Sequence, residues 1–386
     1  MTQKASADVV ILGGGIVGCA TAYYLGKLGV RCVIVERDTV AGHSSGFALG
    51  GLNPLGGIGI PNPLGALSLE SYRMHAELAP TLKEETGVDI EYNLHTALTV
   101  AYSEEEAQPI KSRLPWQQAQ KGFRVEWKSG EDILAIEPRL APGVIGGLVT
   151  QYVGMVDPYK LALAFLQGAE KRGASMRHGV VQGIKFQDNR VTGVQINSGT
   201  IHCSKVVVAM GAWSKDAGPW VGVDLPTEPL KGQLLRLRVK GPPLLYVSWG
   251  HSYAVTKPDD LVWAGTTEEL VGFYETPSKE AQERIMTEAL KALPYLIDAE
   301  LVRQTACLRP VTPDGLPILG KAPGKEGVVV ATGGGRKGIH FSPIMGRIAA
   351  DLAAQGTTGY DISALAPGRP MAYASVSAGL ADPFRF

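Results

Sequence analysis

Residues 8–36 read DVVILGGGIVGCATAYYLGKLGVRCVIVE, and this stretch decides the fold. The apolar run at 8–12 predicts a buried strand, which a triple glycine interrupts. Residues 16–28 then place Ala20, Tyr24 and Leu28 on one face of a helix. Gly29 ends that helix, and residues 31–36 form a second apolar run. The order predicts a βαβ unit, whose parallel strands need helices on both faces of the sheet.

The turn between the first strand and the helix fits the pattern G-x-G-x-x-G through Gly13, Gly15 and Gly18. Gly13 would make the tight turn, Gly15 would admit a pyrophosphate, and Gly18 would let helix and strand pack closely. Glu36 ends the second strand, where a carboxylate can accept hydrogen bonds from ribose hydroxyls. The alternative is a tight turn without a ligand. We expect dinucleotide binding, although this pattern alone does not separate FAD from NAD.

Further apolar strands are expected at 205–209 and 327–331, and alternating strands fill much of 226–305. Helices are expected at 67–86, around 104–120, and at 158–172, 278–293 and 342–354. The prediction is an α/β fold: a Rossmann-like nucleotide-binding domain with an inserted mixed or antiparallel-sheet (α+β) substrate domain. We assign 1–90, 151–226 and 306–365 to the first domain, 91–150 and 227–305 to the second, and 366–386 to a tail.

Composition excludes several other classes. Lys+Arg and Asp+Glu both total 37, so no basic excess points to nucleic acid or an anionic membrane. The four cysteines form no CxxC pair, and we expect no metal site. No signal peptide is evident, and the longest apolar run falls short of the ~20 residues of a spanning helix. We expect a cytoplasmic protein with free cysteines, and leave a homo-oligomer open.

Four further segments separate FAD from NAD. They read HSSGFALGGLNP (43–54), LKGQ (230–233), LRPVTPDGLPILG (308–320) and VVVATGGGRKGIHF (328–341). In this order, behind the glycine pattern, they resemble the D-amino-acid oxidase, glycine oxidase and sarcosine oxidase family, most of all its glycine oxidase branch. The resemblance covers the chain to about residue 360. It implies FAD and the oxidation of a C–N bond in a small amino acid or secondary amine, such as glycine, sarcosine, a proline-like compound or a D-amino acid.

The resemblance also implies which residues hold the cofactor. They are Gly13, Gly15, Ile16, Gly18, Glu36, Arg37, Ser44, Ser45, Gly51, Leu52, Val181, Gly211, Trp213, Cys307, Gly334, Gly335, Arg336, Lys337, Gly338 and Ile339. The glycine loop at 333–338 would aim a helix N-terminus at the pyrimidine edge of the flavin, where negative charge builds on reduction. Arg336 or Lys337 would add to this effect, or else be exposed loop charges.

Three residues are candidates for the chemistry. By similarity, Arg309 clamps the substrate carboxylate, because guanidinium makes paired hydrogen bonds and stays charged when buried. The alternative is a structural ion pair. Tyr253 matches a substrate-facing tyrosine, or else is an ordinary strand aromatic, and Tyr246 is a weaker candidate. His340 matches a substrate-binding basic position, or else packs beside the cofactor.

Cys307 aligns with the cysteine that is covalently linked to flavin in monomeric sarcosine oxidase, whereas glycine oxidase-like chains usually carry Gly there. A free cysteine on a buried strand is more often inert, so we favour non-covalent FAD and keep a thioether as the alternative.

No convincing catalytic base is present, and none is required if the amine arrives neutral. Electrons would pass to oxygen or another acceptor. Three rival functions are a dehydrogenase feeding a quinone or partner protein, a 2-hydroxy-acid oxidiser, and a flavin-binding subunit without a substrate. An NAD enzyme is disfavoured, because the later glycine loop would then have no purpose.

Overall fold

The computed structural model describes residues 6–56 and 62–371, and its nucleotide-type sheet joins strands from the start, middle and end of the chain. The sheet has six strands in the order β17-β18-β11-β1-β2-β7. All are parallel except β17, which runs antiparallel to β18. The strands are β1 (Val9–Leu12), β2 (Cys32–Glu36), β7 (Ser175–His178), β11 (Lys205–Val208), β17 (Ile318–Lys321) and β18 (Val328–Thr332).

The strand order reverses at β1, with β2 on one side and β11 on the other. In open α/β sheets, ligands bind outside the carboxyl ends of the strands at such a switch point. The loop after β1 is therefore the expected entry for a nucleotide.

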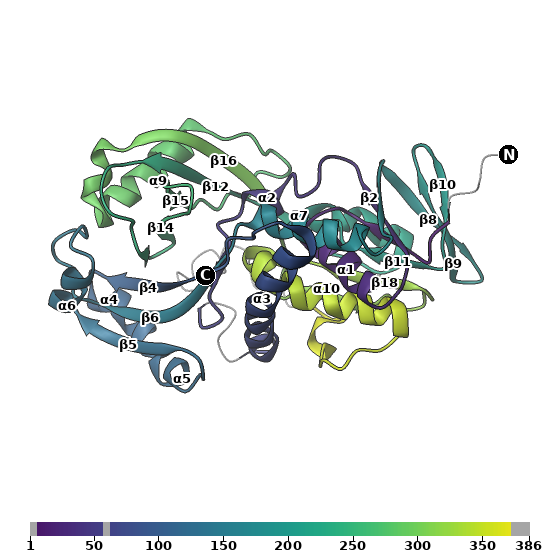
Figure 1. Ribbon diagram of the computed structural model, residues 1–386, viewed down its shortest axis with the longest axis horizontal. Coiled ribbons are helices and arrows are strands. Elements are labelled where there is room, and N and C mark those ends of the chain that lie inside the picture. Colours follow the sequence, from purple (N-terminus) through teal and green to yellow (C-terminus); the bar gives the residue numbers. More distant parts are fainter. Residues whose placement is uncertain (1–5, 57–61, 372–386) are drawn as a thin grey trace.

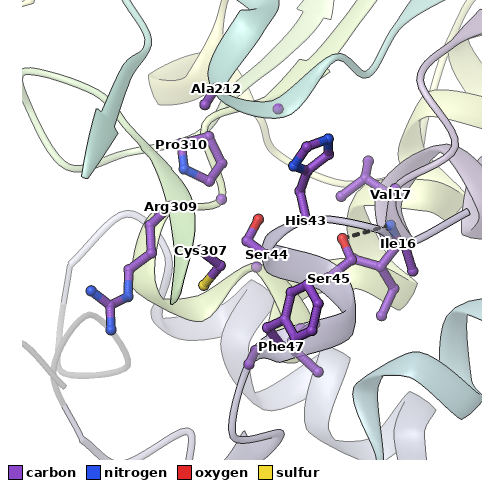
Figure 2. Close-up of a pocket in the computed structure, with 18 of the residues that line it drawn as sticks. Ile16, Val17, His43, Ser44, Ser45, Phe47, Ala212, Cys307, Arg309 and Pro310 are labelled. Carbon is purple, nitrogen blue, oxygen red and sulfur yellow. Dashed lines mark hydrogen bonds between the residues drawn. The ribbon is translucent and has the colours of Figure 1, made fainter. Parts of the chain in front are cut away.

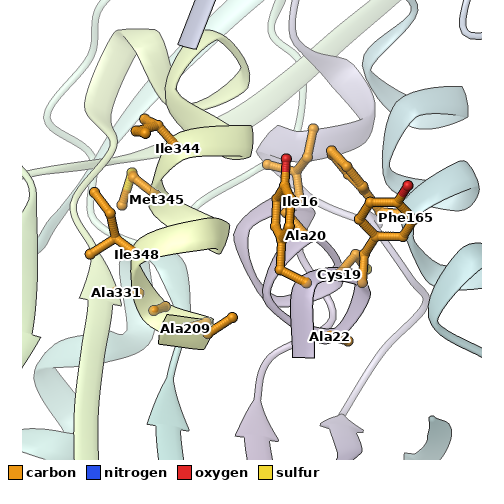
Figure 3. Packing of buried hydrophobic residues seen from close by; sticks show 14 of the residues in the cluster. Ile16, Cys19, Ala20, Ala22, Phe165, Ala209, Ala331, Ile344, Met345 and Ile348 are labelled. Carbon is orange, nitrogen blue, oxygen red and sulfur yellow. The ribbon is translucent and has the colours of Figure 1, made fainter. Parts of the chain in front are cut away.

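Four helices cover one face of this sheet: α1 (Ile16–Lys27), α3 (Gly65–Thr86), α7 (Pro158–Glu170) and α10 (Gly338–Gln355). They bury a continuous apolar cluster (Figure 3). The helices α1 and α10 touch closely, because a Cβ at Gly346 would lie 2.5 Å from the Cβ of Ala20. The first and last parts of the fold are thereby packed together.

The other face carries a small antiparallel sheet and short helices. These are β8 (Val181–Gln187), β9 (Arg190–Ile196), β10 (Gly199–His202), η2 (Gly211–Ala217) and α8 (Gly218–Val221). They bury a second apolar cluster against the sheet.

A larger mixed sheet lies at the other end of the molecule from the six-stranded sheet (Figure 1). It has nine strands in the order β16-β12-β15-β14-β13-β4-β6-β3, with β5 paired to β6. Its pairs are antiparallel except β13 with β4. The strands are β3 (Gly51–Leu52), β4 (Asn93–Ala101), β5 (Arg124–Ser129), β6 (Gly146–Met155), β12 (Glu228–Arg238), β13 (Tyr246–Trp249), β14 (Ser252–Thr256), β15 (Val262–Gly265) and β16 (Glu300–Val311).

Further helices lie around this sheet. They are α4 (Glu104–Lys111), α5 (Leu114–Gln118), α6 (Gly130–Ile136), α9 (Lys279–Ala292) and η3 (Pro294–Asp298). The remaining short helices are α2 (Ser44–Phe47), η4 (Gly335–Lys337) and η5 (Ser363–Leu365).

The predicted fold class is confirmed, whereas two predicted helices differ. The helix expected around 104–120 is divided into α4 and α5, because Pro115 lacks an N–H and occupies the first turn of α5. The helix α10 begins at Gly338 instead of residue 342, although Pro343 lies inside it. The Ser342 hydroxyl donates to the Ile339 carbonyl at 2.8 Å, which is the carbonyl that Pro343 leaves without a backbone partner. The domain boundaries given above stay predictions.

Among the helices of residues 6–56 and 62–371, none combines the length and apolar character required to cross a lipid bilayer. The same residues hold no cluster of His, Cys, Asp or Glu arranged to bind a metal ion. Cys19, Cys32, Cys203 and Cys307 are free and buried.

Candidate active site

Two glycines of the first turn are required by close backbone contacts. Gly13 has φ +106°, and a Cβ there would lie 2.4 Å from the Ala209 carbonyl oxygen. A Cβ at Gly18 would lie 2.0 Å from the Gly13 carbonyl oxygen. At Gly15 the nearest atom is the Ser45 hydroxyl, at 3.3 Å. Gly13 and Gly18 therefore shape the turn, while Gly15 keeps the approach to the helix end open.

The Glu36 carboxylate is held at the end of β2 by two backbone donors. Gly14 N–H donates to one oxygen at 2.6 Å, and Asp38 N–H donates to the other at 2.8 Å. Each oxygen retains a lone pair, which is what a ribose hydroxyl requires. The adjacent Arg37 guanidinium lies over the Trp213 ring, 4.1 Å from its centroid.

The N-terminus of α1 receives a contact from a distant segment. Ile16 N–H donates to the Ser45 hydroxyl at 3.0 Å (Figure 2). This contact holds α2 against the first turn, and α2 also contributes Ser44 to the cavity wall.

A cavity of about 370 Å³ runs from the first glycine turn to the larger sheet. Its walls include Gly15 and Glu36 from one end of the chain and Gly334 and Ile339 from the other. Of the predicted cofactor residues, all line the cavity except Gly18 and Leu52. Gly18 packs against the Gly13 carbonyl instead of facing the cavity, and Leu52 is fully buried in the core.

Glycines in the cavity walls leave room for a bound group. Gly211 and Gly338 both line it, and a Cβ at either would meet no atom within 4 Å. Glycine at these positions widens the cavity beyond what any side chain would allow. The glycine-lined shape, the carboxylate at one end and the basic groups at the other fit FAD.

The second glycine loop supplies two cations with different environments. The Arg336 guanidinium forms a two-point ion pair with Glu268, which includes an Nη2 to Oε2 distance of 2.6 Å. The Lys337 ammonium donates to the Asn53 carbonyl oxygen at 3.2 Å and has no carboxylate partner among the described residues. Burial lowers the pKa of Lys337 to about 8. Of the two predicted cations, Lys337 is the one whose charge is left unbalanced beside the cavity.

Arg309 projects from β16 into the cavity, on the same side of the strand as Cys307. Its guanidinium donates to the Thr266 hydroxyl at 2.8 Å and to the Thr267 carbonyl oxygen at 3.1 Å. A Cβ at Gly232, on the paired strand β12, would lie 2.2 Å from this guanidinium. No ion pair of Arg309 is found within residues 6–56 and 62–371, which argues against the structural alternative.

Tyr253 and Tyr246 also line this end of the cavity, with ring centroids 6.3 Å apart. Burial raises the pKa of Tyr253 to about 12, although the nearby Arg309 charge acts in the opposite direction. Burial likewise raises the pKa of Tyr246. Both phenols therefore stay protonated at neutral pH and can donate hydrogen bonds.

His340 lies in the first turn of α10 and is 1% exposed. Its Nε2 lies 2.9 Å from the Ser68 hydroxyl on α3, and its Nδ1 has no partner among the described residues. Burial, together with the nearby charge of Lys337, lowers the pKa of His340 well below its usual value. The ring is neutral, and its contact with Ser68 ties α10 to α3.

Cys307 lines the cavity but is 7% exposed. Burial raises the pKa of its thiol, against the opposing effect of Arg309. Because the thiolate is the reactive form, this environment disfavours bond formation.

We expect acid precipitation of the purified protein to release FAD into a yellow supernatant. The neutral thiol of Cys307 should leave the flavin unattached, and a Cys307→Ala variant should release the same amount. A yellow pellet from the wild-type protein, absent from the variant, would contradict this expectation.

His43 joins α2 to the connection between β15 and α9. Its Nδ1 lies 2.9 Å from Glu275, its Nε2 lies 3.0 Å from Asp38, and its ring packs on Trp213 with centroids 4.6 Å apart. The hydrogen bond with Glu275, and then that with Asp38, raises the pKa of His43 against the effect of burial.

This contact predicts a pH-dependent contribution to stability. A histidine with a raised pKa stabilises the fold fully below its unfolded pKa of ~6.5, and the contribution is lost as pH rises through the folded pKa. The Tm difference between wild type and His43→Asn should therefore be largest under mildly acidic conditions and shrink with rising pH. Calorimetry across pH measures it, with Glu275→Gln expected to reduce the same dependence. A Tm difference that does not change with pH would show that His43 is not the titrating group.

Several residues in or beside the cavity had no signal in the sequence. Thr266 and Thr267 fix Arg309, and Glu268 neutralises Arg336, yet all three follow a strand without a recognisable motif. His95, on β4, lines the cavity with an Nε2 that has no partner among the described residues. Burial and then the nearby Lys257 lower the pKa of His95.

The fold and the cavity define a dinucleotide-binding protein with a guanidinium, that of Arg309, in the cavity wall at the far end from the first glycine turn. The comparisons with known proteins make this specific. The model of the family described as FAD dependent oxidoreductase (DAO) matches residues 8–352. The chain belongs to this family of FAD-dependent oxidoreductases, and its cofactor is FAD.

Individual relatives are similar over nearly their whole length. The glycine oxidase of Geobacillus kaustophilus (strain HTA426) is 31% identical over 92% of this chain and 95% of the relative. The crystal structure of glycine oxidase from Geobacillus kaustophilus superposes with a TM-score of 0.91, covering 95% of this chain and 100% of that one at 31% identity. Hydrogen cyanide synthase subunit HcnC of Pseudomonas aeruginosa is 28% identical over 92% of this chain and 94% of the relative.

Proposed function

We propose that this protein oxidises a small amino acid or secondary amine that carries a carboxylate, by hydride transfer from Cα to N5 of the flavin. Glycine, sarcosine, proline-like compounds and D-amino acids belong to this class. The proposal rests chiefly on the Arg309 guanidinium, which faces the cavity and, within the part of the chain that the structure describes, hydrogen-bonds to neutral oxygens only. The similarity to glycine oxidases supports the same substrate class.

The residues around Arg309 can orient such a substrate. Thr266 and Thr267 hold the guanidinium in place, and its remaining N–H groups are available to a carboxylate as paired donors. The protonated phenol of Tyr253 offers a further donor on the same wall. Fixing the carboxylate in this way would place Cα at a set position, and orientation alone can lower a barrier by several kcal/mol.

The cofactor supplies the hydride acceptor, and the protein supplies charge and shape around it. The Lys337 ammonium and the N-terminus of α10 would stabilise negative charge at this end of the cavity. Loss of hydride from a neutral amine needs no base, and the imine then hydrolyses in water.

The direct test is an anaerobic titration of the FAD-loaded protein with glycine, sarcosine, proline, several D-amino acids and a 2-hydroxy acid. We expect the visible absorbance of the oxidised flavin to be lost with at least one carboxylated amine, and not with its carboxylate-free analogue. Bleaching by the hydroxy acid alone, or by no compound, would contradict the proposal. Oxygen uptake compared with dye reduction then identifies an oxidase or a dehydrogenase.

A further inference from the structure

Two arginines reach the cavity at the end where substrate would bind, and they differ in one respect. Arg309 hydrogen-bonds to a hydroxyl and a peptide carbonyl, both neutral. Arg336 places two of its nitrogens on the two oxygens of Glu268. The guanidinium of Arg309 is therefore available to an anion, whereas that of Arg336 is already neutralised.

Glu268 is held in this position by the local chain. It directly follows Thr266 and Thr267, so the segment that fixes Arg309 also presents the carboxylate to Arg336. The side chains of Glu268 and Arg336 are 10% and 17% exposed. Burial acts to raise the pKa of Glu268, but the hydrogen bonds and charge of Arg336, together with the charges of Arg309 and His251, outweigh it, so the net shift is downward and the carboxyl stays ionised.

We propose that Glu268 determines substrate specificity by setting the number of carboxylates that the site accepts. With Arg336 neutralised, Arg309 is the one guanidinium at this end of the cavity without a carboxylate partner among the described residues, so the site takes amines with one carboxylate and rejects those with two. A second carboxylate would have to displace Glu268 from Arg336 or lie beside it, and both cost free energy. This inference rests on the proposed function, because it takes Arg309 to be the carboxylate clamp.

The proposal makes a prediction for each charge state of the pair. Arg309, Arg336 and Glu268 together carry one positive charge in the wild type, two in Glu268→Gln, none in Arg336→Gln, and one in the double variant. Lys337 is unchanged throughout, so its charge cancels in every comparison. Affinity for a dicarboxylate should follow this series.

The experiment titrates each FAD-loaded protein with propionate and with malonate, which have one and two carboxylates, and follows the flavin absorbance. The wild type should bind propionate more tightly than malonate. In Glu268→Gln the Kd for malonate should fall about tenfold, the effect of one new close charge pair, while that for propionate changes far less. The proposal would be overturned if Glu268→Gln bound malonate no more tightly than the wild type does. It would also be overturned if the affinity for propionate rose as much as the affinity for malonate.

The double variant Glu268→Gln/Arg336→Gln leaves no charge of the pair buried alone, so it guards against misfolding of the single variant. It should regain the wild-type preference for propionate. Arg336→Gln, which leaves Glu268 unpaired beside Arg309, should bind propionate at least about tenfold more weakly than the double variant. Equal propionate affinity in these two proteins would also overturn the proposal.

Failure of this inference can be distinguished from failure of the proposed function. If Arg309→Leu binds propionate as well as the wild type, the clamp itself is wrong. If Arg309→Leu no longer binds propionate while Glu268→Gln shows no higher affinity for malonate than the wild type, only the role assigned to Glu268 is wrong. The kinetic counterpart compares D-alanine with D-aspartate, and the kcat/KM ratio should shift toward D-aspartate in Glu268→Gln.

Discussion

Replacing Arg309 with leucine is expected to raise the KM for carboxylated amines roughly a hundredfold, because losing a buried charge-assisted pair costs about 3 kcal/mol and each ~1.4 kcal/mol is a factor of ten. The guanidinium has no carboxylate partner among the described residues, so its removal leaves no protein anion unpaired. Steady-state kinetics on the substrate found in the anaerobic panel measure the change. FAD binding should be retained.

Two further variants separate the clamp from a general effect of charge. Arg303→Leu removes a cation from the exposed part of the same strand, and its KM should match that of the wild type. Gly232→Ala keeps Arg309 but places a methyl group 2.2 Å from the guanidinium, so the side chain must move and KM should rise to a smaller extent. If Arg309→Leu and Arg303→Leu have the same kinetics, Arg309 does not bind the carboxylate.

Replacing Gly18 with alanine is expected to yield a protein that is purified without FAD. The new Cβ would lie 2.0 Å from the Gly13 carbonyl oxygen, and neither group is a flexible side chain that can turn aside. The turn or α1 must shift, which moves the helix N-terminus away from the phosphates. We expect FAD affinity to fall by at least about a hundredfold, equivalent to ~2.8 kcal/mol, as measured by flavin fluorescence during reconstitution.

Gly183→Ala is the matched control, since that glycine lies in β8, has no positive φ, and has no atom within 4 Å of the position that an added methyl group would occupy. It should be purified yellow and bind FAD as the wild type does. Circular dichroism compares the overall helix content of the colourless Gly18→Ala protein with that of the wild type, and so distinguishes loss of FAD from loss of the fold. Stoichiometric FAD in Gly18→Ala, with unchanged affinity, would refute the assigned role of this contact.

The parts of the fold that could be predicted are those whose signals are local. The turn at residues 13–18 combines apolar strands, helix spacing and glycines within one short stretch, so its structure follows from neighbours in the chain. The prediction of a single helix around 104–120 was wrong, because Pro115 lies in the first turn of a second helix. The start of α10 was placed too late because Ser342 satisfies a carbonyl that Pro343 cannot, and a side-chain contact of this kind leaves no periodic pattern.

Within the site, the residues predicted from glycine loops and conspicuous side chains do meet around one cavity. Arg309, Tyr253 and His340 all line it, together with Gly13 and Gly335. Their roles stay predictions that the variants above test. The threonines that hold Arg309 were missed. A Thr-Thr pair after a strand is common, and its role becomes visible only when the structure shows that it hydrogen-bonds to Arg309.

The sequence by itself predicted that this protein binds a dinucleotide on a βαβ unit, because that feature depends on residue type and short spacing. The family resemblance, not spacing, implied that Arg309 clamps a carboxylate. Only the tertiary structure decided which charges are free. Arg336 is neutralised by Glu268 from 68 positions away, and Arg309 is held by residues 42 and 43 positions away. The net charge that a substrate encounters depends on which of these side chains are paired. Residues so far apart in the sequence come within hydrogen-bonding distance only when the chain folds.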